Sequence, residues 1–225
     1  MLLPNLKRQH LLLIAEGLLL AGALVSAALL SRIDEWHPIS LVGLLLVLAL
    51  VAERLEFEVR GQHLSASLVV LVLAMSLLGP APAVVFGILV TLPNSASRRL
   101  PPEQWLHNLS AFAIFPLVGG LIIRLLVGDV HDSRNHHLTS SVTFALIVFA
   151  VFMVCNGLNF AVIAVTWRVN QGLRIMRQAR ELFLPMQPGQ MALGALTAML
   201  AIAYGNLGLP ALFALILVLA LFQYL

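Results

Sequence analysis

The stretch HLSASLVVLVLAMSLLGPAPAVVFGILVTLPN, from His63 to Asn94, decides how this chain is expected to fold. Two short apolar runs, Leu64–Leu78 and Ala83–Leu92, meet at a corner from Gly79 to Pro82, and Pro93 closes the second run. As helices these runs rise about 22 Å and about 15 Å, whereas the hydrocarbon core of a bilayer is roughly 30 Å thick. The sequence therefore predicts a tight helical hairpin or a re-entrant loop inside a membrane protein.

The composition agrees with a membrane protein. Of the 225 residues, 60% are hydrophobic and only 10% are charged, whereas about a quarter of the residues of a soluble domain are charged. The apolar run from Leu11 to Leu30 is too long for a signal peptide and is interpreted as a retained span. We expect an all-α polytopic integral membrane protein with a single transmembrane domain over 1–225.

About eight helical passages are predicted along the chain. They cover roughly 11–31, 38–52, the two arms of the hairpin 63–94, 106–127, 142–167, 189–205 and 210–225. Between the second and third passages, apolar and charged residues alternate over 53–63. Because a period of two is typical of extended chain, this segment is expected to be extended and to lie at the membrane interface.

Basic residues divide unequally between the two sets of loops. Ten of the 13 Lys and Arg residues fall in the N-terminal tail and in the loops that follow the second, fourth and sixth passages. The chain is therefore expected to be a multi-pass protein of the cell (inner) membrane. The positive-inside rule predicts that both its termini lie in the cytoplasm. Because the basic residues lie in loops that face lipid headgroups, the same rule accounts for the net charge of +3. No nucleic acid is therefore expected as a partner.

A second Gly/Pro-cornered hairpin is predicted at 189–225, because the Gly-Leu-Pro-Ala corner at Gly208 resembles the one at Gly79. This echo suggests two parallel four-helix halves. The alternative is that such corners serve any tight helical hairpin. Interrupted apolar segments at matching positions in two halves indicate a binding site in transporter-like folds, so we expect a ligand near the Gly79–Pro82 corner.

Polar residues inside apolar runs are candidate ligand-binding residues, since burying them in lipid is costly. The candidates are Glu16, Ser65, Ser67, Asn108, Asn156, Asn159, Gln190 and Tyr204. Most of them lie near the cytoplasmic ends of their spans, which predicts a polar cluster or a shallow cavity there. The alternative is that they join helices by hydrogen bonds. Glu16 needs a partner, for which Arg54 or Arg60 is expected.

The run from 168 to 180 is expected to be a basic amphipathic helix on anionic headgroups. Its membrane-surface residues are Arg168, Arg174, Arg177 and Arg180. His131, Asp132, His136 and His137 share an outer loop, but their spacing matches no metal site with a known mechanism. No metal, no cofactor and no catalytic residue is predicted, since no hydrolase, zinc-protease or P-loop motif occurs.

Four stretches resemble a family of bacterial multi-pass sensory modules. They are LEFEVRGQHLSAS from Leu55, MSLLGPAPAVVFG from Met75, HNLS from His107 and NGLNF from Asn156. In that family the module precedes an HD-GYP-like phosphohydrolase or a GGDEF diguanylate cyclase. The resemblance covers the whole chain, implies a sensor, and brings no catalytic residue with it. The uncapped end LVLALFQYL is read as a helix that continues into a cytoplasmic output domain after residue 225.

Three functions follow from these observations. The first is a non-enzymatic sensory or regulatory module that responds to a small molecule or a membrane state and signals through its last helix. Its partners would be the lipid bilayer and a cytoplasmic signalling domain or partner subunit, and a homo-oligomer is one alternative. The second is the substrate-binding component of a small-molecule, vitamin-like uptake transporter. The third is a structural subunit of a membrane complex.

Overall fold

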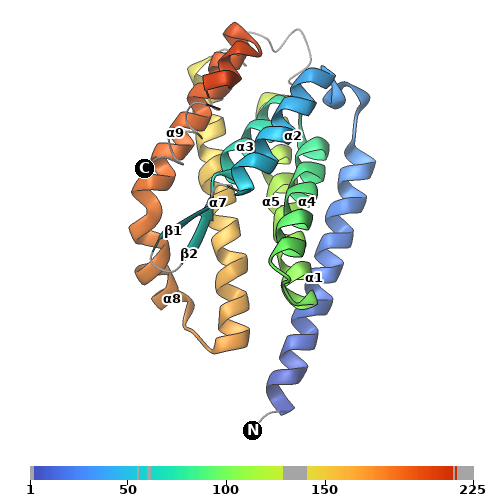
Figure 1. Ribbon diagram of the computed structural model, residues 1–225, viewed down its shortest axis with the longest axis vertical. Coiled ribbons are helices and arrows are strands. Elements are labelled where there is room, and N and C mark those ends of the chain that lie inside the picture. The colour runs from blue at the N-terminus through green and yellow to red at the C-terminus, as the bar shows by residue number, and fades with distance from the viewer. Residues whose placement is uncertain (1–2, 55, 60–61, 129–140, 215, 217–225) are drawn as a thin grey trace.

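The computed structural model describes residues 3–54, 56–59, 62–128, 141–214 and 216. The helices form a bundle along one long axis, and the N-terminal end of α1 lies at the bottom of Figure 1. In chain order the elements are α1 (Leu3–Leu30), η1 (Ile33–Trp36), α2 (Ile39–Arg54), β1 (Glu56–Val59), β2 (Gln62–Ser65), α3 (Ser67–Leu77), α4 (Pro80–Ser97), α5 (Pro102–Val127), α7 (Val142–Gln171), α8 (Ile175–Gln178), the π-helical segment η3 (Ala179–Phe183) and α9 (Leu184–Leu207).

Five helical segments within the described residues are long and apolar enough to cross a membrane. They are His10–Leu30, Pro80–Ser97, Pro102–Val127, Val142–Val169 and Ile175–Leu207. The prediction of a helical fold is therefore confirmed, with β1 and β2 as its exception. Fewer helices reach membrane length than the eight expected passages, because α2 has 16 residues and α3 has 11. Most of 210–225 lies outside the described residues.

The short helix α3 lies in the middle of the bundle. Every residue from Val69 to Leu77 is at most 5% exposed, and α3 packs against α2, α4, α5, α7 and α9. A helix that is apolar on all sides is stable only where other elements surround it. Because its 11 residues rise about 16 Å, α3 is much shorter than the helices around it.

The corner after α3 is tightly packed. Gly79 has φ 124°, and Pro80 then begins α4. A Cβ on Gly79 would lie 2.8 Å from Oε1 of Glu35, and a Cβ on Gly120 would lie 2.6 Å from Cα of Pro80. Only glycine permits this backbone conformation and this approach of α5 to the corner without strain.

Helix α4 continues beyond the point where the sequence predicted its end. Pro93 was expected to close it, but α4 runs through Pro93 to Ser97. A proline removes only one helical hydrogen bond, and Pro93 is exposed, so its ring meets no neighbouring helix. Helix α4 packs against α5, and Gly87 allows α4 to contact the carbonyl oxygen of Phe112.

The alternating segment after α2 is extended, as predicted. It forms an antiparallel pair in which Glu56 lies opposite Ser65 and Val59 opposite Gln62. The extended part is shorter than expected, because Glu53 and Arg54 still belong to α2. This difference places Glu53 at depth in the bundle, where it is 7% exposed.

The expected amphipathic helix over 168–180 is wrong. Arg168 belongs to the last turn of α7, which ends at Gly172 in the left-handed conformation. Arg174 then precedes α8, and a continuous helical segment runs from Ile175 to Leu207. A left-handed glycine ends a helix efficiently, so the basic run is divided between two membrane-length helices and the seventh passage begins well before residue 189.

The two Gly/Pro corners are alike only locally. Gly208 follows α9 with φ 68°, and a helix begins at Pro210, as α4 begins after Gly79. The helices that lead into the corners differ, because α3 is short and buried whereas Ile175–Leu207 has 33 residues, of which Met199 is 68% exposed. Within the described residues these hairpins are therefore not equivalent parts of two similar halves.

Candidate functional site

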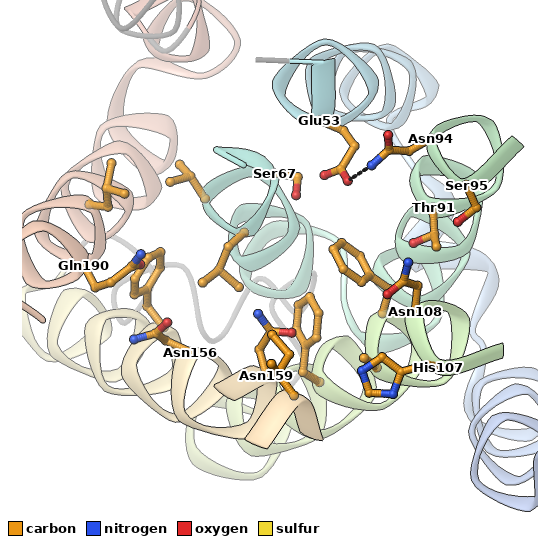
Figure 2. A pocket seen from close by; sticks show the side chains of 18 of the residues that line it. Glu53, Ser67, Thr91, Asn94, Ser95, His107, Asn108, Asn156, Asn159 and Gln190 are labelled. Atoms are coloured by element: carbon orange, nitrogen blue, oxygen red, sulfur yellow. Dashed lines mark hydrogen bonds between the residues drawn. The ribbon is translucent and has the colours of Figure 1, made fainter. Parts of the chain in front are cut away.

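A cavity of about 270 Å³ lies below the N-terminal end of α3. Side chains from α2, α3, α4, α5, α7 and α9 line it, and Figure 2 shows how they converge from these helices. Its polar lining residues are Glu53, Ser67, Thr91, Asn94, Ser95, Arg98, His107, Asn108, Asn156, Asn159 and Gln190. Because α3 is shorter than its neighbours, the helices around its first turn enclose space that no backbone fills.

The cavity brings together five of the eight predicted ligand-binding residues. They are Ser67, Asn108, Asn156, Asn159 and Gln190. Tyr204 does not line it, since 14 residues of α9 separate Tyr204 from Gln190 and correspond to about 21 Å along the helix. The side chain of Ser65 lies outside the part of the chain that the structure describes.

One side of the cavity carries charge. Glu53 accepts a hydrogen bond at Oε1 from Nδ2 of Asn94 (2.8 Å), and Nε of Arg98 donates to Oδ1 of the same Asn94 (3.0 Å). Asn94 thus bridges a carboxylate and a guanidinium. The second oxygen of Glu53, Oε2, is buried and has no hydrogen-bond partner among the described residues. Arg98 is exposed and marks where the cavity reaches the surface.

The other side of the cavity is lined by neutral amides. Figure 2 shows Asn156 and Gln190 across the cavity from Glu53 and Asn94. Asn156 and Asn159 are three residues apart and therefore share a face of α7. Asn156 is 9% exposed, and its Nδ2 has no hydrogen-bond partner among the described residues. Buried polar atoms in native proteins are almost always satisfied, so this site is suited to water or a ligand.

Aromatic rings complete the lining. Phe112, Phe115 and Phe152 all contact the cavity, and the first two meet edge to face with ring centroids 5.3 Å apart. Phe152 is fully buried. These rings supply an apolar surface next to the amides, and a few polar groups set in an apolar wall are typical of small-molecule sites.

Glu16 does not line the cavity but is joined to it through His107. Nδ1 of His107 lies 2.8 Å from Oε1 of Glu16 and 3.0 Å from Oγ1 of Thr166. Since the Thr166 hydroxyl donates to the carbonyl of Val162, Nδ1 carries the proton that both acceptors share. His107, and not the expected Arg54, is therefore the partner of Glu16 among the described residues, and the other expected partner, Arg60, lies outside them.

A smaller cavity of about 60 Å³ adjoins the first between α7 and the α8–α9 segment. Both cavities are lined by Asn156, Asn159 and Gln190. The rings of Phe160 and Phe183 stack at its edge, with centroids 4.5 Å apart. The amides therefore face a polar cavity on one side and an aromatic groove on the other.

The Gly79 corner lies away from this cavity. The void beside it has a volume of about 10 Å³, which is near the minimum for one water. Glu35, 4% exposed, forms an ion pair there with Arg124, and Nη1 of Arg124 also donates to the carbonyl of Leu30 (3.1 Å). The corner is therefore filled by protein, and the expectation of a ligand there is wrong.

The basic residues at the α7–α8 turn make short local contacts. Arg168 donates to the carbonyl of Gly172 (3.3 Å), and Arg177 pairs with Glu181 one turn later (2.8 Å). Exposed pairs of this kind contribute little to stability. Arg174 and Arg180 are at the same end of the bundle, so a membrane-surface role for these arginines stays a prediction.

No metal site is evident in the part of the chain that the structure describes, where no three His, Cys, Asp or Glu residues form a suitable group. His131, Asp132, His136 and His137 lie outside it.

Comparison with protein-family models, curated proteins and solved structures finds no match. The resemblance to bacterial sensory modules therefore stays a prediction.

Proposed function

We propose that this protein is a non-enzymatic integral membrane sensory or regulatory module that binds a small molecule in the cavity below α3. The observation that carries this proposal is the 270 Å³ cavity and its polar lining from six helices. Ligand sites are typically concave, with a few convergent polar groups in an apolar wall. Helix–helix hydrogen bonds alone would not require the polar groups to surround a space of this size.

The five apolar helices support a location in the bilayer. The end of the bundle that carries the α4–α5 and α7–α8 turns holds Arg98, Arg99, Arg168, Arg174, Arg177 and Arg180. Arg32 and Arg124 lie at the opposite end. Under the positive-inside rule, the basic end faces the cytoplasm, and the N-terminus lies on that side.

The position of the cavity mouth favours a sensor over an uptake component. Exposed Arg98 lines the cavity at the basic end, so a cytoplasmic ligand would enter without crossing the membrane. The Gly79 corner at the other end is closed by the pair between Glu35 and Arg124. An uptake component, the second candidate, needs a route from that closed side.

Binding would be coupled to helix packing through α9. Gln190 lines the cavity, and one turn later Gly194 packs so closely on α7 that a Cβ would lie 3.0 Å from the ring of Phe152. A ligand that contacts both helices favours one packing over another. In this proposal α9 and the segment after it pass that bias to a cytoplasmic domain or partner subunit.

Native mass spectrometry of the protein in lipid nanodiscs tests the proposal. We expect a small-molecule adduct on the native chain that is lost in Gln190→Leu. Asn206→Leu is the matched control, since Asn206 is an exposed amide on the same helix and donates to the carbonyl of Ile202 one turn earlier. An adduct that survives Gln190→Leu, or a native chain without one, contradicts the proposal.

Proteoliposomes separate the sensor from the uptake component. The compound identified as the adduct is added to one face of the protein at a time, in vesicles in which its orientation is known. A sensor of a cytoplasmic ligand binds it from the basic end. Binding from the Gly79 end that Gln190→Leu abolishes would assign the protein to uptake instead.

A further inference from the structure

The charges around the cavity are compensated within the protein. Among the described residues, Glu53, Arg98 and His107 are the ionisable groups of its lining. Asn94 holds the first two together by hydrogen bonds of 2.8 and 3.0 Å. His107 faces the carboxylate of Glu16 at 2.8 Å. Each ionisable group of the lining thus already has a polar partner within the protein, and Oε2 of Glu53 is the one ionisable lining atom that is buried without a hydrogen-bond partner among the described residues.

Besides Asn94, the lining of the cavity contains four neutral amide side chains. Asn108, Asn156, Asn159 and Gln190 come from three helices, and Figure 2 shows Asn156 and Gln190 opposite Glu53. Each amide has donors and acceptors. Four amides together match a molecule that alternates donors and acceptors along an edge, and they match a full charge poorly, because an ion that leaves water without a counter-charge loses much solvation energy.

Phe112, Phe115 and Phe152 suit a flat ring. They lie in the same lining as the amides, and aromatic rings stack favourably face to face with an offset or edge to face. A volume of about 270 Å³ is slightly below the usual range for drug-sized ligands. The size and the lining are thus suited to one small ring system.

We propose that the ligand is a small, uncharged, planar molecule with a hydrogen-bonding edge, of the class of heteroaromatic amides and nucleobases. This proposal rests on the proposed function, since it names the ligand class of the same cavity. The ring lies against the phenylalanines and its polar edge faces the amides of α7 and α9. The bridged pair of Glu53 and Arg98 at the mouth disfavours ions of either sign.

Three probes that share one ring and differ in charge test this proposal. They are nicotinamide, which is neutral, nicotinate, an anion, and 3-(aminomethyl)pyridine, mainly a cation at pH 7. Binding to the full chain in nanodiscs is measured at pH 7 by saturation-transfer NMR, with titrations for dissociation constants. We expect nicotinamide to bind about tenfold more tightly than either ion, which corresponds to about 1.4 kcal/mol.

Variants locate the binding of nicotinamide. Asn159→Leu and Gln190→Leu are expected to weaken it about tenfold, the loss that corresponds to about 1.4 kcal/mol. Asn206→Leu, outside the cavity, should leave its affinity unchanged. Melting temperatures measured on the same samples show whether each variant is folded, so a loss of binding is not mistaken for unfolding.

Several outcomes would overturn the neutral-ligand proposal. Tighter binding of nicotinate that Arg98→Gln abolishes, or tighter binding of the cation that Glu53→Gln abolishes, overturns it and leaves the cavity as a binding site. Equal binding of all three probes, or no binding of any, also overturns it. The proposed function depends separately on the adduct detected by native mass spectrometry, so the two failures can be told apart.

Discussion

The two ends of α3 differ in how their polar residues are used. At the Gly79 end, Glu35 and Arg124 pair directly and leave a void of about 10 Å³. At the Ser67 end, polar side chains from six helices surround about 270 Å³. Both ends bury polar groups, but only the first uses them to close contacts between helices.

This difference shows how a short central helix creates a site. A helix as short as α3 (Ser67–Leu77) cannot fill a bundle whose five longest helical segments have 18 to 33 residues. The glycines at Gly79 and Gly120 let the neighbouring helices close over one end. The space that α3 leaves unfilled is then concentrated at its first turn.

The largest expected loss of stability follows a substitution at the Gly79 end of α3. Glu35→Gln leaves Arg124 without its buried counter-charge and is expected to lower the free energy of unfolding by about 3–5 kcal/mol. The measurement is unfolding in detergent–SDS mixed micelles. Glu35→Gln combined with Arg124→Met should recover much of the loss, since no buried charge then remains. A cost well below about 1 kcal/mol for Glu35→Gln would show that this end is not held by the pair.

The next effect tests the close approach at the corner. Gly120→Ala places a methyl group 2.6 Å from the backbone of Pro80 and should destabilise by about 1–3 kcal/mol. Gly43→Ala is the control, because nothing lies within 4 Å of the position that a Cβ on residue 43 would take. There alanine should stabilise the helix by up to about 1 kcal/mol. Equal effects of the two substitutions in the same assay would contradict the tight packing.

A substitution at the Ser67 end of α3, which contains the cavity, should change the stability in the opposite direction. Asn156→Leu removes a buried amide whose Nδ2 has no partner among the described residues. We expect it to raise the stability of the ligand-free protein by about 1 kcal/mol while abolishing the adduct. Asn206→Leu, an exposed amide, should change stability by less than about 0.5 kcal/mol. If Asn156→Leu destabilises the protein, its amide joins helices and the alternative interpretation is preferred.

Much of the helical fold is readable from the sequence, because apolar runs with corner residues are strong local signals. The extended segment at Glu56–Val59 and the corner at Gly79 follow from alternation and from Gly-Pro chemistry. The continuation of α4 past Pro93 is not readable, because it depends on contacts with distant residues, such as the hydrogen bond from Asn94 to Glu53.

The candidate site is readable in part for the same reason. Ser67, Asn108, Asn156, Asn159 and Gln190 are polar residues within apolar runs, and their shared depth predicts that they meet. Glu53, Asn94 and Arg98 lie beyond the predicted ends of the second passage and of the apolar run Ala83–Leu92, because the ends of α2 and α4 were predicted too early. The pairing of Glu16 with His107 joins two helices 91 residues apart in the chain, a contact that local patterns do not encode.

Cysteine accessibility on α7 tests most directly whether the cavity at the Ser67 end of α3 is open. In a Cys155→Ala background, Asn159→Cys lies in the cavity wall and Val148→Cys in the buried core. The two positions are 11 residues apart and about 20° apart around the helix. A small uncharged thiosulfonate should modify Asn159→Cys rapidly and leave Val148→Cys unmodified. Equal protection of both cysteines in folded protein would contradict an open cavity below α3.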